Sequence, residues 1–227
     1  MRDSYHQITT KQNTDKKLTS DQMTALKNIE IAQHQGKQKF LLYGVTGSGK
    51  TQIYIEMALK ARALGKQVLI LVPEIVLTGQ LVTSFKEYFT DDVAVIHSRL
   101  SIGERNDTFW RIRTKQVGII IGARSALFAP FEDLGLIVMD EEHDPSYKQD
   151  ESPRYHSHDI IEKMAEIYHA TLIMGSATPS LESYYKAQIG EYVLLKMPNR
   201  IDNLPLPYIE GVDMREELRM GNRKSFL

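Results

Sequence analysis

The chain of 227 residues and 26.0 kDa is long enough for one sizeable domain with tails, which would bury about 70% of its unfolded surface. Hydrophobic residues make up 42% and charged residues 25%, which is ordinary for a soluble globular protein and excludes disorder throughout. No apolar run approaches the roughly 18 residues of a membrane span, and the polar N-terminus lacks the apolar core of an export signal. The absence of cysteine excludes disulfides and thiolate metal sites, so the composition favours the cytoplasm.

Charge is balanced in total but segregated along the chain. The 28 basic and 29 acidic residues leave a net charge of −1, which does not indicate a polyanionic partner. Residues 97–124 are rich in arginine, whereas residues 130–151 contain eight acidic residues and the single basic Lys148. This pattern fits either an anion-binding face beside a cation-binding one or an unevenly charged solvated surface, and it does not decide between them.

Hydrophobic patterns predict alternating helices and strands. Thr19 and Gln22 have the spacing of a capping box, which predicts a helix with apolar residues at helical spacing to residue 31. In chain order, the patterns then predict a strand at 40–43, a helix at 50–64, a strand at 68–72, a helix at 76–89, a strand at 93–96, a helix from a second capping box at 101 to 116, strands at 117–121 and 136–139, a helix at 158–169, a strand at 171–174 and a helix at 180–188. The runs 192–195 and 208–212 favour edge strands.

Strands that are apolar on both faces and separated by helices are typical of a parallel sheet covered on both sides. We therefore expect an α/β domain over residues 18–200, with a mostly parallel central sheet and helices on both faces. Residues 1–17 are predicted to be a flexible arm or the remnant of a linker, and residues 201–227 a connector.

A phosphate-binding motif follows the first predicted strand. Residues 44–51, G-V-T-G-S-G-K-T, fit G-x-x-x-x-G-K-[ST] in full and open a helix, as this motif requires. Glycines let backbone N–H groups surround a phosphate at the positive end of that helix. The alternative is a plain glycine-rich turn, which the full motif between a strand and a helix disfavours. The predicted nucleotide ligands are Gly44, Thr46, Gly47, Ser48, Gly49, Lys50 and Thr51, with the Lys50 amine on the β- and γ-phosphates and the Thr51 hydroxyl on Mg²⁺.

An acidic box ends the predicted strand at 136–139. Asp140 is placed to hold Mg²⁺, and Glu141 to orient or deprotonate an attacking water. Alone, the box also fits an acidic loop after a core strand, but the upstream phosphate loop favours the magnesium role. Two neighbouring carboxylates favour hydrolysis over kinase-type transfer, and the lack of an N-K-x-D motif disfavours a GTPase.

With the phosphate loop, the sequences D-E-x-H at 140–143 and S-A-T at 176–178 resemble the first of the two RecA-like lobes of superfamily 2 helicases. From about residue 18 to the C-terminus, further segments resemble the primosomal replication-restart DNA helicases. They are V-P-E-I at 72–75, G-A-R-S-A-L-F-A-P at 122–130, S-Y-K-Q at 146–149, P-R-Y-H at 153–156, G-S-A-T-P-S-L-E-S at 175–183 and D-M-R-E-E-L at 213–218.

The resemblance implies a role for each matching residue. Gln22 would belong to a nucleotide-sensing segment, although its place in a capping box explains it equally well. Lys50, Asp140, Glu141 and His143 would carry catalysis, while His143, Ser176 and Thr178 would couple nucleotide state to lobe closure. DNA-backbone contacts would come from Pro73, Glu74, Gln80, Arg124 and Ser125, and an aromatic-rich loop would engage single-stranded DNA through Tyr147, Lys148, Arg154 and Tyr155.

Two positions depart from the family pattern. His158 stands where the family usually has arginine, which removes a fixed positive charge at pH 7, and Gly79 stands where proline is usual, which loosens that segment. The spacing His156-x-His158 also suggests a metal pair, but it lacks further ligands at suitable spacing.

The resemblance implies the motor lobe of an ATP-dependent 3′-to-5′ DNA helicase in replication restart and primosome assembly. Its cofactors would be ATP and Mg²⁺, with zinc only in a part of the parent protein outside this chain. Its partners would be forked and single-stranded DNA, single-strand DNA-binding protein and helicase-loading primosome proteins, with no membrane. We expect weak nucleotide binding and little hydrolysis by this lobe alone, because no second lobe with an arginine finger is recognised in the sequence.

Two alternatives stay open at this point. One is a nucleotide- and DNA-binding module of another superfamily 2 translocase, without catalysis of its own. The other is a different phosphate-loop enzyme such as a small-molecule kinase, which the S-A-T segment and the tyrosine-containing loop disfavour.

Overall fold

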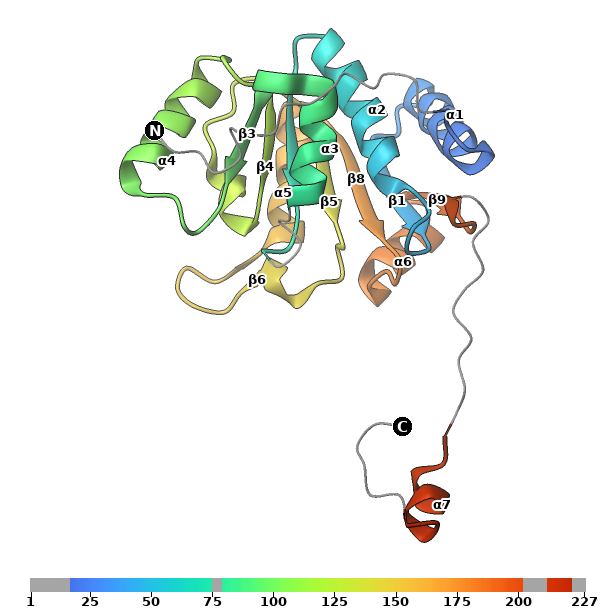
Figure 1. The fold of residues 1–227 in the computed structure, drawn as a ribbon. Coiled ribbons are helices and arrows are strands. Elements are labelled where there is room, and N and C mark those ends of the chain that lie inside the picture. The colour runs from blue at the N-terminus through green and yellow to red at the C-terminus, as the bar shows by residue number, and fades with distance from the viewer. Residues whose placement is uncertain (1–16, 75–78, 202–211, 222–227) are drawn as a thin grey trace.

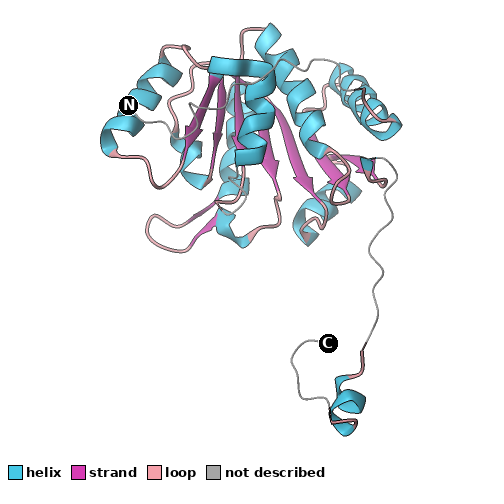
Figure 2. Ribbon diagram, in the orientation of Figure 1, coloured by secondary structure: helices cyan, strands magenta, loops and turns pink. Residues whose placement is uncertain are grey.

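The structure is a computed structural model that describes residues 17–74, 79–201 and 212–221. Its centre is a seven-stranded sheet in the order β3-β4-β2-β5-β8-β1-β9, in which every pairing is parallel (Figures 1 and 2). The strands are β1 Lys39–Gly44, β2 Gln67–Leu71, β3 Val93–Ile96, β4 Ile119–Gly122, β5 Leu134–Asp140, β8 Thr171–Ser176 and β9 Val193–Met197. The predicted α/β fold with a parallel sheet is confirmed.

Helices cover both faces of the sheet because the strands are apolar on both faces. Successive residues of β1 show this: Phe40 and Leu42 belong to one core cluster, and Leu41 belongs to the other. The first cluster includes residues of α1 Ser20–His34, α2 Lys50–Ala63 and α3 Gly79–Phe89. The second contacts α4 Ile102–Arg113, α5 Ser157–Tyr168 and α6 Leu181–Gln188. In Figure 1, α2 and α3 lie in front of the sheet and α5 lies behind it.

Strand order brings the three sequence motifs to one edge of the sheet. Strands β5, β8 and β1 are neighbours, with Asp140 opposite Gly175 and Tyr43 opposite Ser176. Parallel strands end at the same edge, which is where open α/β sheets bind their ligands. The phosphate loop after β1, the acidic box at the end of β5 and the S-A-T segment at the end of β8 therefore meet there.

Most predicted elements are confirmed, including both capping boxes at the starts of α1 and α4 and the edge strand β9. The predicted helix at 76–89 is observed from Gly79, and its first residues lie outside the described residues. The same holds for residues 208–211 of the last predicted strand and for most of the proposed arm and connector, so the domain boundaries stay a prediction.

Several short elements were not predicted. They are the two-stranded hairpin of β6 Lys148–Gln149 and β7 Tyr155–His156, the short helices η1 Thr90–Asp92, η2 Arg124–Phe128 and η3 Pro145–Tyr147, and the helix α7 Met214–Arg219. In the described ranges, every helix is too short or too polar to cross a bilayer.

Candidate functional site

The phosphate loop has the backbone geometry that its glycines permit. Gly47 and Gly49 have φ angles of +80° and +84°, in the left-handed region that side chains other than glycine's rarely adopt. A Cβ on Gly49 would lie 2.4 Å from Gln22 Nε2 and 2.9 Å from Ile201 Cδ1, so no side chain fits there. The Lys50 amine donates to the Gly44 carbonyl at 3.0 Å, which directs it back across the loop.

Gln22 links the first helix to this loop. Its Nε2 donates to the Gly49 carbonyl at 3.1 Å, and its Oε1 accepts from the Thr19 amide at 2.8 Å. The two interpretations of Gln22, as a capping-box residue and as part of a nucleotide-sensing segment, are therefore compatible. One side chain completes the capping box and also contacts the phosphate loop.

The loop and the acidic box share one open cavity of about 780 Å³. Thr46, Lys50 and Thr51 line it together with Asp140 and Glu141. Ser48 Oγ is buried without a hydrogen-bond partner among the described residues, so an additional acceptor or donor would satisfy it. A cavity of this size, lined by phosphate-binding backbone at one end and carboxylates at the other, fits a magnesium nucleotide.

The two carboxylates of the acidic box differ in their surroundings. Asp140 is 8% exposed, and burial raises its pKa although the Tyr54 hydroxyl and Lys50 oppose that change. Burial and the neighbouring charge of Asp140 raise the pKa of Glu141. A metal ion beside them would favour the ionised Asp140, whereas Glu141, with a raised pKa, is better suited to accept a proton.

The described residues contain no group of three or more histidine and acidic side chains placed to hold a metal. Magnesium does not need one, since one or two carboxylates, a hydroxyl, waters and substrate phosphates complete its coordination. Thr51 and Asp140 lie on the same cavity and fit that requirement.

His143 connects the acidic box to the S-A-T segment. Its Nδ1 lies 2.8 Å from Ser176 Oγ, and its Nε2 lies 3.4 Å from Thr178 Oγ1. Ser176 Oγ also accepts from the Thr178 amide at 2.9 Å. The three predicted coupling residues thus form one hydrogen-bonded group at the ends of β5 and β8.

Glu142 is a buried carboxylate to which the sequence pattern assigned no role. It is 1% exposed and accepts hydrogen bonds from His158 Nε2 at 2.9 Å, from the Ser180 amide at 2.7 Å and from the hydroxyls of Ser180 and Ser183. Burial alone would raise its pKa, but these hydrogen bonds outweigh burial and lower it. Glu142 therefore fixes the starts of α5 and α6 relative to the acidic box.

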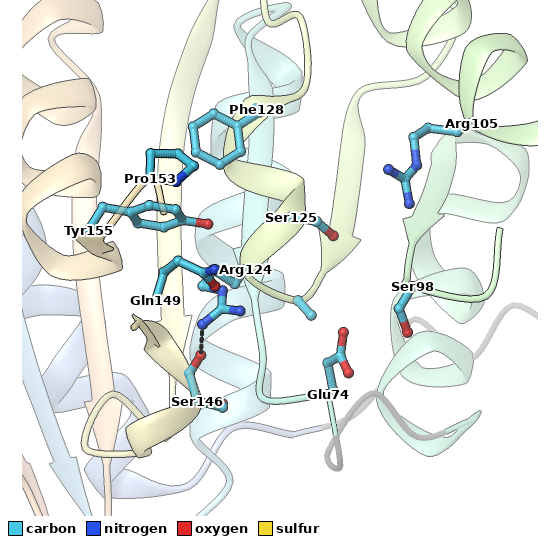
Figure 3. A pocket seen from close by; sticks show the side chains of 11 residues that line it. Glu74, Ser98, Arg105, Arg124, Ser125, Phe128, Ser146, Gln149, Pro153 and Tyr155 are labelled. Carbon is cyan, nitrogen blue, oxygen red and sulfur yellow. Dashed lines mark hydrogen bonds between the residues drawn. The ribbon is translucent and has the colours of Figure 1, made fainter. Parts of the chain in front are cut away.

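A second hollow, of about 620 Å³, lies beside η2 and the β6–β7 hairpin. Figure 3 shows Arg124, Gln149 and Tyr155 on one side of it, with Arg105 and Ser98 across from them. Arg124 donates to the carbonyls of Ser146 and Lys148, and its guanidinium carbon lies 5.9 Å from the centre of the Tyr155 ring. Among the described residues, Arg105 Nε and Ser125 Oγ are buried without a partner.

Three of the predicted DNA-contact residues occupy other places. Tyr147 is 1% exposed, and its hydroxyl donates to the Asp140 carbonyl at 2.7 Å, so the prediction that its ring faces DNA is wrong. Gln80 lines the nucleotide cavity rather than the second hollow. Pro73, which follows β2, is buried.

The remaining predicted DNA-contact residues are at or near this hollow. Glu74, Arg124, Ser125 and Tyr155 line it. Lys148 and Arg154 lie on the adjoining face of the β6–β7 hairpin, where the Arg154 Nε donates to the Asp150 carbonyl at 3.0 Å and Lys148 pairs with the Asp150 carboxylate. Ser98, Arg105, Phe128 and Gln149 were missed as site residues, although Arg105 lies in the arginine-rich stretch at 97–124.

The departures from the family pattern have different structural settings. His158, in place of an arginine, contacts the Glu142 carboxylate and lies 3.0 Å from His156 Nδ1 through its own Nδ1. Gly79 begins α3, and a Cβ placed on it would meet nothing within 4 Å.

Residues 19–187 match the DEAD/DEAH box helicase family, and the chain belongs to this family. Membership implies the use of ATP and Mg²⁺. Among curated proteins, the chain is 49% identical over 226 residues to replication restart protein PriA of Bacillus subtilis (strain 168), covering 99% of this chain and 28% of that protein. It is 46% identical over 197 residues to replication restart protein PriA of Synechocystis sp., covering 85% of this chain and 24% of the relative.

Solved structures agree on the fold. The chain resembles RecG bound to a three-way DNA junction, with a TM-score of 0.59 at 23% identity, covering 87% of this chain and 25% of that one. It also resembles the helicase MrfA bound to DNA, with a TM-score of 0.57 at 19% identity, covering 82% of this chain and 26% of that one. These likenesses show a RecA-like α/β fold with a phosphate loop, in a chain that spans about a quarter of the length of its relatives.

Proposed function

We propose that this chain is the nucleotide-binding motor lobe of an ATP-dependent 3′-to-5′ DNA helicase that acts in replication restart. The observation that carries the proposal is the single cavity that joins the phosphate loop to Asp140 and Glu141. The similarity to replication restart protein PriA over nearly the whole chain supports the biological setting.

Within that cavity each side chain has a distinct part in hydrolysis. Backbone N–H groups of the loop and the Lys50 amine bind the phosphates; Thr51 and Asp140 would hold Mg²⁺, which would neutralise phosphate charge. Glu141 orients a water and accepts its proton, as its raised pKa favours. His143 and Ser176 then communicate the state of the nucleotide to the edge of the lobe, because they are hydrogen bonded to each other.

The second hollow is the proposed DNA contact. Arg124, Arg105 and Ser125 supply donors suited to phosphate oxygens, which carry no sequence information. Tyr155 and Phe128 pack edge to face at 5.5 Å and leave apolar ring surface next to them, which suits stacking with unpaired bases. Lys148 and Arg154 extend this surface along the hairpin.

The similarity to PriA proteins, rather than contacts in this chain, supports the proposed partners and setting. We propose forked and single-stranded DNA as the substrate, with single-strand DNA-binding protein and helicase-loading primosome proteins as partners, in the bacterial cytoplasm. The relatives that carry the name replication restart protein PriA support this assignment.

Binding of ATP and Mg²⁺ to the purified chain tests the proposal directly. Lys50→Ala should weaken binding by at least about 10-fold, because it removes the charge that faces the β- and γ-phosphates. Lys27→Ala, on the exposed side of α1, is the matched control and should bind as the unaltered chain does. Equal binding by Lys50→Ala and the unaltered chain would contradict the proposal.

Steady-state hydrolysis separates a motor part from an independent enzyme. We expect little turnover by this chain, with or without single-stranded DNA, because it spans about a quarter of the relatives that it matches. In a longer protein that contains this chain, Lys50→Ala should abolish unwinding and leave DNA binding intact. Unwinding that persists would reduce the proposal to a DNA-binding module without catalysis.

A further inference from the structure

Two residues that follow β9, Arg200 and Ile201, contact the phosphate loop directly. We call residues 199–201 the strap. The Arg200 Nε donates to the Thr46 carbonyl at 3.1 Å, and the Ile201 amide donates to the Gly47 carbonyl at 2.9 Å. Just before them, the Met197 carbonyl accepts from the Val45 amide at 3.2 Å, so the chain follows the loop from the end of the sheet onward.

The strap is also attached to the first helix. Asn199 donates to Asp21 Oδ2 through its amide nitrogen at 3.2 Å and through Nδ2 at 3.1 Å. Asp21 precedes Gln22, whose side chain donates to the Gly49 carbonyl. The start of α1 and the strap thus contact the same loop and each other.

The Arg200 and Ile201 side chains lie next to Gly47 and Gly49, the two phosphate-loop glycines with positive φ. A Cβ built on Gly47 would lie 3.2 Å from Arg200 Nε, and one built on Gly49 would lie 2.9 Å from Ile201 Cδ1. Glycine has the widest choice of backbone conformations, so these two positions gain most from a neighbour that restricts them.

The chemistry of a phosphate loop explains why such a neighbour matters. The loop binds a phosphate by turning its N–H groups inward, which leaves carbonyl groups that need donors elsewhere. Arg200, Ile201 and Gln22 supply donors to the carbonyls of Thr46, Gly47 and Gly49, three of the loop's eight residues. These contacts hold the loop in the geometry that a phosphate requires before any nucleotide arrives.

We propose that the strap is a positioning element for the phosphate loop, and that strap docking and nucleotide binding stabilise each other. Arg200 is its positioning residue, acting through Thr46 rather than on the substrate. The proposal rests on the proposed function, since it assumes that the loop binds phosphates. Because coupling between two binding events is reciprocal, a docked strap should raise nucleotide affinity and a bound nucleotide should hold the strap in place.

The first experiment measures binding of ADP with Mg²⁺, and of adenosine, to the full chain. Arg200→Ala should weaken binding of ADP with Mg²⁺ by about 3- to 10-fold, the effect of losing roughly one hydrogen bond. Asn199→Ala should weaken it in the same direction, since it loosens the other attachment of the strap. Adenosine has no phosphate, so its affinity should not change. Arg215→Ala, an exposed arginine in α7, is the control and should bind as the unaltered chain does.

The second experiment follows amide hydrogen exchange at Ile201. Addition of ADP with Mg²⁺ should slow exchange at this amide in the unaltered chain, because its hydrogen bond to Gly47 is reinforced. In Arg200→Ala, exchange at Ile201 should be faster in the absence of nucleotide. A purely structural contact would leave exchange at Ile201 independent of nucleotide.

The outcomes distinguish this proposal from the proposed function. If the unaltered chain binds ADP with Mg²⁺ but Arg200→Ala binds equally well and exchange at Ile201 does not respond, the strap proposal is wrong and the proposed function stands. Equal losses for ADP and adenosine would also overturn the strap proposal, since the whole pocket would then be disturbed. If the unaltered chain binds no nucleotide at all, both fail.

Discussion

The hydroxyl of Tyr54 donates a hydrogen bond of 2.8 Å to Asp140 Oδ1. Tyr54 lies in the first turns of α2, directly after the phosphate loop, so this bond ties the helix that begins at Lys50 to Asp140, the proposed magnesium ligand. Burial and the charge of Asp140 raise the pKa of Tyr54 well above its usual range, which keeps the hydroxyl protonated as a donor. The phosphate loop and the acidic box, the two parts of the proposed nucleotide site, are therefore linked by one buried side chain.

Removing that hydroxyl should impair magnesium binding without unfolding the lobe. In Tyr54→Phe the ring still fills the core, but Asp140 loses its orienting donor, and such outer partners are worth about 10- to 100-fold in metal affinity. We expect the Mg²⁺ concentration that gives half-maximal nucleotide binding to rise about 10-fold, measured by titration with Mg²⁺. Tyr168→Phe, which loses a bond to the Phe131 carbonyl far from the loop, is the control. An unchanged Mg²⁺ dependence would show that Tyr54 does not orient Asp140.

Gly175 should tolerate no side chain because of the same pair. A Cβ there would lie 1.8 Å from the Tyr54 hydroxyl and 3.4 Å from Asp140 Oδ1, and the fully buried tyrosine has no room to retreat. We expect Gly175→Ala to lower the free energy of unfolding by about 1–3 kcal/mol, as overpacking does. Urea unfolding measures this. In a Tyr54→Phe background the cost should shrink, because the closest atom is gone, and additive losses would refute the assigned clash.

Acid should weaken the lobe through Glu142. The ionised form of Glu142 is favoured in the folded state, so its stabilisation is complete above the unfolded pKa of about 4.3 and is lost as pH falls through the lower folded pKa. We expect Glu142→Gln to reduce the free energy of unfolding by about 1–3 kcal/mol at pH 7, and the difference from the unaltered chain to vanish in stronger acid. Urea unfolding between pH 7 and pH 3 measures both. A difference that is constant with pH would contradict the assignment.

Arg124 should contribute to DNA binding through charge and through the hairpin that it holds. We expect Arg124→Ala to weaken binding of single-stranded DNA. The slope of log affinity against log salt concentration should also fall by about one. Fluorescence anisotropy at several salt concentrations measures this, with Arg113→Ala, an exposed arginine of α4, as the control. If Arg124→Ala lowers affinity with no change in salt dependence, its role is limited to holding Ser146 and Lys148.

Local signals predicted the fold and the frame of the site. The phosphate loop, both capping boxes and the buried strands were identifiable because spacing and hydrophobic pattern determine them within a few residues. The two motifs identified Lys50 and Asp140, and the parallel sheet, whose strands end at one edge, brings them to one cavity.

The remaining features depend on contacts between distant segments. Tyr54 has the apolar pattern of a core helix, so its bond to Asp140 leaves no mark in the sequence. The resemblance placed Tyr147 in a DNA-facing aromatic loop, but its ring belongs to the second core cluster and is buried there. Glu142 was passed over because buried carboxylates are rare, and the strap follows a proline and has no periodicity at all.

The start of α1 has a consequence for reading related sequences. A capping box accepts either glutamate or glutamine at its third helical position, since both offer an oxygen to the cap. At position 22 the nitrogen of the same terminal amide also donates to the Gly49 carbonyl, and a carboxylate has no hydrogen to give. Homologues with glutamate at this position would keep the helix cap but lose the donor to the glycine turn. In such sequences a capping box alone would therefore not indicate a supported phosphate loop.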